Sequence, residues 1–192
     1  MNTYGTESRA PSVRADSTLS RPLLVIAATS LAAGIVAGGA SYLNRSPEHE
    51  THVEGTAALW PHLLLLALTA ALIVVLRRRG HHPFRLLLAP VSTIAAQRLG
   101  RTLRSILTHP TALLRLLLSI LPIALLVYSP FRIGVQILGG LDPNFTVNAW
   151  GGPSYLGAMV FHYFDGTLLM AAAAALLNLL LLPSKQAAHA RR

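Results

Sequence analysis

His162 and Asp165 lie three residues apart in an otherwise apolar stretch that ends at Leu182. That spacing places both side chains on one face of a helix. The apolar run from Thr167 to Leu182 is shorter than the about 20 residues that a membrane span needs, so the hydrocarbon region has to include Asp165 near its outer edge. An acid inside such a segment is costly, and it commonly marks a ligand or proton site.

Three further side chains start from the same outer side of the membrane and can join this pair. Ser154 and Tyr155 open the same span after a Trp-Gly-Gly-Pro turn, and His62 lies in the first turn of the second apolar segment. The sequence therefore predicts a ligand or proton site at the outer face. Its residues are His162, Asp165, Ser154, Tyr155 and His62.

Two other interpretations of the pair stay open at this point. In the first, His162 and Asp165 bond to each other, to Arg132 or to Trp150, and only hold the last span in place. In the second, Ser154 adds a nucleophile and the three residues form a catalytic set. Eight residues of helix separate Ser154 from His162 by about 12 Å, which is beyond hydrogen-bond reach. We therefore predict no catalytic residues and no enzyme activity.

The loop from 44 to 56 contains the other cluster of chemically active side chains, Glu48, His49, Glu50 and His52. Imidazole and carboxylate are ligands for divalent metals. The spacing is one residue short of the zinc-protease pattern HExxH, and a proline and a glycine flank it. We interpret the loop as a solvated acidic loop and expect no metal and no cofactor. The chain has no cysteine, which excludes disulfides and thiolate sites.

Composition indicates the elements that must position these groups. Of the 192 residues, 53% are hydrophobic and 12% are charged, where soluble domains have about 25% charged residues. The apolar residues form runs long enough to cross a bilayer. We predict an all-α, four-span transmembrane helical bundle over residues 21–183, with a disordered cytoplasmic tail before it and a basic one after it. The predicted spans are about 22–43, 57–76, 111–130 and 155–182, and the tails are 1–20 and 184–192.

Basic residues set the predicted orientation. The second span ends at Arg77-Arg78-Arg79, whereas the acids of the 44–56 loop and Asp142 lie on the other side. The positive-inside rule then places both termini in the cytoplasm. Almost all of the net charge of +9 comes from arginine, a bias that we associate with bacterial genomes of high GC content. We expect a multi-pass protein of a bacterial plasma membrane.

The long loop 77–110 contains arginines and no acid. From Pro90 onward, apolar residues recur mostly at steps of three and four, which predicts an amphipathic interfacial helix between spans two and three. We expect its arginines to bind anionic lipid headgroups. No aromatic residue is interleaved among them in the helical part, so we do not expect nucleic acid as a partner. The predicted lipid-binding residues are Arg77, Arg78, Arg79, Arg85, Arg98, Arg101 and Arg104.

Gly34 and Gly38 form a GxxxG pattern in the first span, which lets a second helix approach closely. We expect this surface to pack against another membrane protein or a second copy. The run LDPNFTVNAWGGPSYLGAMVFHYFDG, residues 141–166, resembles a segment of small, uncharacterised integral membrane proteins of actinobacteria. That resemblance implies the four-helix class and a bacterial plasma membrane, and it implies no catalytic residue.

Taken together, these patterns predict a non-enzymatic accessory or interaction subunit with a polar site at the outer face. The alternative is a small transporter or proton-coupled permease component in which Asp165 titrates. A sensory transmembrane module is a third hypothesis.

Overall fold

The computed structural model describes residues 19–81, 88–108 and 110–183. The predicted tails and Arg85 therefore lie largely or wholly outside the described residues. The elements are α1 (Arg21–Leu43), α2 (Leu59–Arg78), η1 (Ala89–Val91), α4 (Thr93–Arg104), α5 (Pro110–Gly139), α6 (Pro143–Thr146) and α7 (Tyr155–Leu180). Four of them, α1, α2, α5 and α7, are long and apolar enough to cross a bilayer. The predicted all-α class with four spans and a short helix between the second and third is confirmed.

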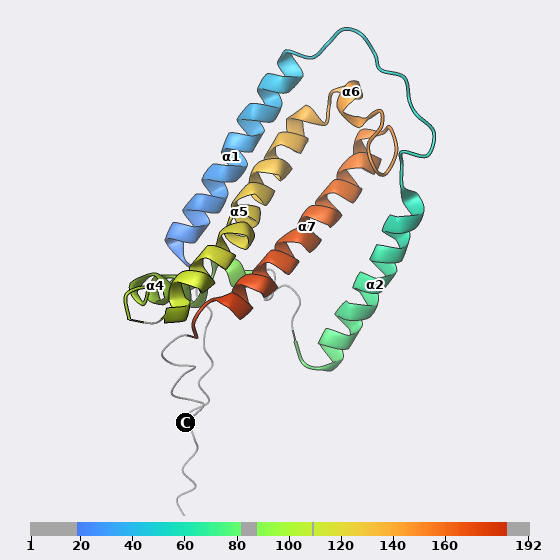
Figure 1. Cartoon of the computed structure of the whole chain (residues 1–192). Coiled ribbons are helices and arrows are strands. Elements are labelled where there is room, and N and C mark those ends of the chain that lie inside the picture. Colours follow the sequence, from blue (N-terminus) through green and yellow to red (C-terminus); the bar gives the residue numbers. More distant parts are fainter. Residues whose placement is uncertain (1–18, 82–87, 109, 184–192) are drawn as a thin grey trace, which may run out of the picture.

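The long helices lie side by side around α5. Helices α1 and α7 pack on α5, and α2 stands beyond α7, with few contacts to any other helix (Figure 1). We call the end that carries residues 44–58 and 140–154 the loop end. The opposite end, which carries α4 and Arg77 to Arg79, is called the arginine end below.

Glycines bring α1 and α5 into close contact. A Cβ atom added to Gly34 would overlap the Phe131 carbonyl, and one added to Gly38 would overlap the Val135 carbonyl. Gly134 of α5 faces Leu31 in the same way. Backbones this close allow extensive van der Waals contact, which is what holds helices together in lipid. The GxxxG surface therefore packs within the chain, whereas we had expected a separate partner.

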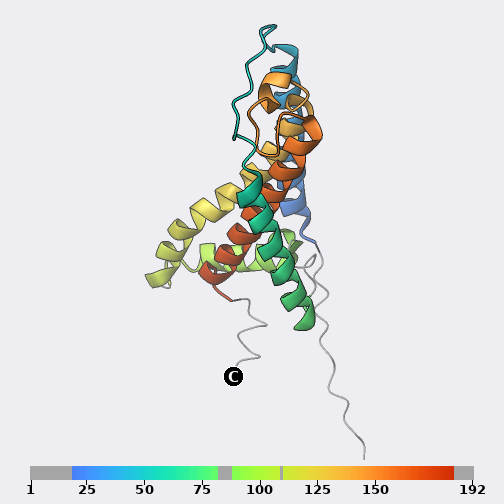
Figure 2. The same ribbon diagram turned by 90° about the vertical axis from the view of Figure 1, so that its right-hand side faces the viewer.

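Helix α5 continues further than its sequence suggested. We predicted that the third span ends at Pro130, but α5 runs through Pro122 and Pro130 to Gly139. Each proline lacks an N–H donor, and Figure 2 shows that α5 is bent rather than broken. Ser129, directly before the second proline, donates its hydroxyl to the Leu125 carbonyl one turn earlier at 2.7 Å.

At the arginine end, α4 lies across the ends of α5 and α7 (Figure 1). Arg98 donates to the carbonyls of Asn178 and Leu181 at 2.6 and 2.7 Å, and it also bonds the Asn178 side chain. These carbonyls have no partner within α7, and a cation there also opposes the negative end of the helix dipole. Burial lowers the pKa of the Arg98 guanidinium.

Two more arginines act on the same helix end. Arg101 donates to the Pro183 carbonyl at 2.6 Å, and Arg115 of α5 donates to the Leu180 carbonyl at 3.0 Å. We had assigned Arg98 and Arg101 to lipid headgroups. In the structure, Arg98 and Arg115 donate to carbonyls at the C-terminal end of α7, which need donors, and Arg101 donates to the segment that follows the helix. Contact of these arginines with lipid headgroups stays a prediction.

At the loop end, asparagine side chains fix the 44–58 segment. Asn144 accepts from the Glu50 N–H at 2.9 Å and donates to the Glu48 carbonyl at 2.6 Å. Asn148 accepts from the Val53 N–H at 2.8 Å. Across residues 19–81, 88–108 and 110–183, no group of three or more His, Asp or Glu side chains is placed to hold a metal ion.

Candidate functional site: a pocket between α2, α5 and α7

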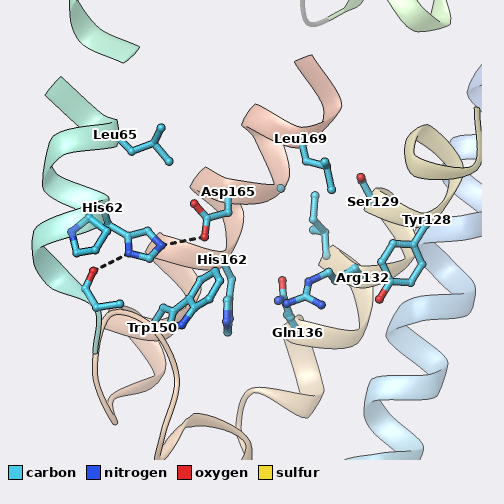
Figure 3. A pocket seen from close by; sticks show the side chains of 14 residues that line it. His62, Leu65, Tyr128, Ser129, Arg132, Gln136, Trp150, His162, Asp165 and Leu169 are labelled. Atoms are coloured by element: carbon cyan, nitrogen blue, oxygen red, sulfur yellow. Dashed lines mark hydrogen bonds and ion pairs between the residues drawn. The ribbon is translucent and has the colours of Figure 1, made fainter. Parts of the chain in front are cut away.

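His62 and Asp165 meet across the gap between α2 and α7. The His62 Nε2 atom lies 3.0 Å from the Asp165 Oδ2 atom, and the His62 Nδ1 atom lies 2.8 Å from the Ala58 carbonyl oxygen (Figure 3). The side chain of His62 is 8% exposed and that of Asp165 is 25% exposed. Among the described residues, this is the one side-chain hydrogen bond that joins α2 to another element.

The two bonds of His62 define how many protons the pair holds. A carbonyl oxygen only accepts, so the Nδ1 atom carries a proton and donates it to Ala58. A second proton must then lie between His62 Nε2 and Asp165 Oδ2 for that contact to be a hydrogen bond. It belongs either to an imidazolium that faces a carboxylate or to a carboxylic acid that faces a neutral imidazole. Either way the pair is neutral overall and holds one exchangeable proton.

Aromatic rings enclose the histidine of this pair. The ring centroid of His62 lies 5.2 Å from that of Trp150 and 4.7 Å from that of Phe161, the latter edge to face. Trp150 is held by the turn that follows it. Gly151 has a φ of +91°, and a Cβ atom on it would overlap the Gly157 carbonyl of α7. The turn thus packs Trp150 beside His62.

Below the pair lies a cavity of about 590 Å³, within the range of small-molecule sites. Residues of α2, α5 and α7 line it together with Trp150, and one side of it is open to the surroundings of the chain. Its polar lining comes from His62, Ser129, Arg132, Gln136, His162 and Asp165. Its apolar and aromatic lining includes Leu65, Tyr128, Ile133 and Leu169.

Two side chains that line the cavity, one from α5 and one from α7, have buried polar atoms without hydrogen-bond partners in the described part of the chain. Gln136 is 1% exposed, and its Oε1 atom has no hydrogen bond within the described residues. The Nδ1 atom of His162 is also buried without one. Arg132 extends from α5 toward α7 beside both (Figure 3), and no carboxylate in the described part of the chain lies within ion-pair distance of it. Buried polar atoms without partners are rare in native proteins, so these mark a place for a ligand or water.

The structure brings together three of the five residues that we assigned to the site. His62, His162 and Asp165 all line the cavity. Ser154 instead caps α7, where its Oγ atom accepts from the Gly157 N–H at 3.1 Å. Tyr155 donates to the Ile137 carbonyl of α5 at 3.1 Å. Neither residue lines the cavity.

The hypothesis of a His162–Asp165 bond was wrong, since Asp165 pairs with His62 of α2. Sequence reasoning also left Gln136 and Tyr128 out of the site and considered Arg132 only as a structural partner. Ser129, Arg132 and Gln136 follow one another at steps of three and four, so they share one face of any helix that includes them. Ending the span at Pro130 hid this pattern.

No family model, no curated protein and no solved structure matches this chain. The resemblance of residues 141–166 to actinobacterial membrane proteins stays a prediction. What is shown is an integral membrane protein with four candidate spans and, among three of them, a largely apolar cavity that several polar side chains line.

Proposed function

We propose that this chain is a non-enzymatic integral membrane protein that binds a small ligand in the cavity and links its binding to a proton. His62 and Asp165 hold that proton. The observation that carries the proposal is their hydrogen bond, which lines the cavity and also attaches α2 to α7. Such a protein would serve as a carrier component or as a sensor, depending on what α2 does when the proton leaves.

The number of protons on the pair determines how well α2 is held. With one shared proton, the Nε2 and Oδ2 atoms are donor and acceptor. When that proton is lost, the Nε2 lone pair faces a carboxylate, and when a second is gained, an imidazolium faces a neutral acid. Both changes weaken the bond. The attachment of α2 is therefore strongest at an intermediate pH.

The proposal is tested by measuring the distance between α2 and α7 as a function of pH. The chain has no cysteine, so spin labels at Leu72→Cys on α2 and Leu179→Cys on α7 are the only ones present. Both positions are exposed, and both lie toward the arginine end. Pulsed electron paramagnetic resonance in lipid nanodiscs should give a narrow distance distribution at intermediate pH and broader ones on either side.

Three controls isolate the pair from the other ionisable groups of the cavity, which are His162, Arg132 and Tyr128. Asp165→Asn should remove the pH dependence, because an amide can donate to Nε2 without exchanging a proton. His162→Gln should leave it in place. Labels at Val25→Cys on α1 and Ile120→Cys on α5 should give distances that do not vary with pH. A wild-type α2–α7 distribution that is constant with pH would overturn the proposal.

We propose, as a second candidate, that the chain is an accessory subunit with α2 as its partner surface. The supporting observation is that α2 contacts the rest of the chain mainly through its first turn, while Leu64, Leu68 and Leu72 stay exposed. A partner membrane protein should co-purify in mild detergent, and Leu64→Ala with Leu68→Ala should weaken its recovery. Val36→Ala, at an exposed position of α1, is the matched control.

A further inference from the structure

We infer that the cavity takes an amphiphile with one anionic headgroup, a carboxylate or a phosphate, whose hydrocarbon tail lies between α2 and α7. The inference rests on the proposed function in that it treats the cavity as a ligand site, and it names the class of ligand. It is carried by the arrangement of charge, unpaired polar atoms and apolar walls around Arg132.

The charge balance of the cavity favours an anion. Asp165 is the one acid in the lining, and its Oδ2 atom is bonded to His62 on the α2 side. Because that pair is neutral overall, Asp165 does not neutralise Arg132. Arg132 is exposed on the surface of the chain about two turns before the loop end of α5, and among lipid chains a guanidinium there needs an anion or water to satisfy it. Its planar set of donors fits a carboxylate or a phosphate through two parallel hydrogen bonds.

The unpaired atoms beside Arg132 can complete such a site. Rotation of the Gln136 amide exchanges its Oε1 and Nε2 atoms and presents a donor, since the two are assigned only from their surroundings. His162 presents a donor when its Nδ1 atom carries the ring proton. Gln136 is almost fully buried, so water cannot satisfy it from outside the cavity. Arg132, Gln136 and His162 would therefore surround a headgroup from two helices.

The rest of the lining fits a hydrocarbon chain. Leu65 of α2, Ile133 of α5 and Leu169 of α7 form the apolar walls of the cavity. Toward the arginine end, α2 separates from α7 (Figure 1), and its leucines are exposed. In a bilayer that separation is filled by acyl chains, so a lipid-borne ligand can enter sideways while its headgroup stays near the loop end. A water-soluble anion would leave the apolar walls without contacts.

Trp150 lines the cavity, so its fluorescence can report on what the cavity contains. The full chain has two tryptophans, so a Trp60→Phe background leaves Trp150 as the sole indole. In phosphatidylcholine nanodiscs, brominated stearate should quench Trp150 emission saturably. The methyl ester of the same acid and a brominated phosphatidylcholine should quench only to the level set by their presence in the bilayer.

Arg132→Gln should weaken the apparent affinity for brominated stearate about tenfold or more, because it removes a charge-assisted pair. Arg132→Lys should restore part of the affinity. Arg45→Gln, which changes the other arginine of the loop end, should have no effect. A thermal melt of each variant checks folding. Leu169→Trp, in a variant that keeps Trp150 and is read by native mass spectrometry, should exclude stearate by filling the apolar half of the cavity.

Each other result overturns the inference. Equal saturable quenching by the methyl ester or by the zwitterionic lipid would show that the cavity accepts any acyl chain. Displacement of stearate by acetate or inorganic phosphate at similar concentrations would show a site for soluble anions. No quenching above the bilayer level would show that no such amphiphile binds. A pH-dependent α2–α7 distance together with any of these would leave the proposed function standing and reject only the ligand class.

Discussion

At the scale of single residues, the bond between His62 Nδ1 and the Ala58 carbonyl determines the chemistry of the site, because it fixes one proton on Nδ1 and leaves Nε2 to share a second proton with Asp165. Ala58 has a left-handed backbone with a φ of +47°, which a residue with a Cβ atom adopts only at a cost. The bond to His62 helps to stabilise that conformation. The sequence cannot show this arrangement, since a left-handed alanine has no compositional signature.

Removing the carboxylate without replacing its polar atoms should destabilise the protein. In Asp165→Ala the buried Nε2 atom of His62 has no partner, which costs about 1–3 kcal/mol for an unsatisfied buried group. Asp165→Asn keeps a hydrogen-bonding partner and should lose less. Thermal unfolding in nanodiscs measures both. Equal stability of the alanine variant and the wild type would mean that His62 finds another partner.

How far the site was predictable differs from residue to residue. An acid inside an apolar run is visible in any sequence, so Asp165 and His162 were found from their neighbours alone. His62 was assigned to the same site from its place at the outer end of its span. Its bond to Asp165 was not predicted, because His62 lies 103 residues away and only packing brings α2 to α7. Ser154 was assigned to the site as a polar residue close to it in the sequence. In the structure its Oγ atom accepts a hydrogen bond from the Gly157 N–H and caps α7.

At the scale of elements, the contact between α1 and α5 depends on glycines from both helices. Gly38→Ala should lower stability by about 1–3 kcal/mol, because the added methyl group overlaps a backbone carbonyl that cannot move without separating the helices. Gly39→Ala is the matched control, since its methyl group would meet only the mobile end of Leu138 at 3.2 Å. Thermal unfolding of the two variants should differ. An equal loss of stability in both variants would mean that overlap with the α5 backbone is not the cause, since alanine has a higher helix propensity than glycine at either position.

Hydropathy predicted the existence and type of the elements well, because a bilayer demands about 20 apolar residues whatever the packing. It failed at the end of the third span. A proline inside a helix is expected to stop it in water, but a span has no solvent to receive its freed carbonyls, so continuing the helix and bending it is favoured. The same reasoning explains the arginines of α4, whose donors are used by the end of α7.

At the scale of the whole molecule, the arginine end is predicted to face the cytoplasm. Cysteine introduced at Thr51 in the loop-end segment should react with a membrane-impermeant maleimide on intact cells. Cysteine at Gly80, just after Arg79, should react only after the membrane is opened. Both positions are exposed, so neither is shielded by the protein. The opposite pattern would invert the proposed orientation.

The attachment of α2 also has a consequence for how the protein is made. The interface between α1 and α5 needs no residue from any other helix. The two helices can therefore pair as soon as α5 has left the ribosome and entered the bilayer. The residues that hold α2, Trp150, Phe161 and Asp165, are synthesised about 90 to 100 residues after His62. During synthesis, the His62 side chain of α2 therefore has none of these partners until α7 has been inserted into the bilayer and completes the cavity.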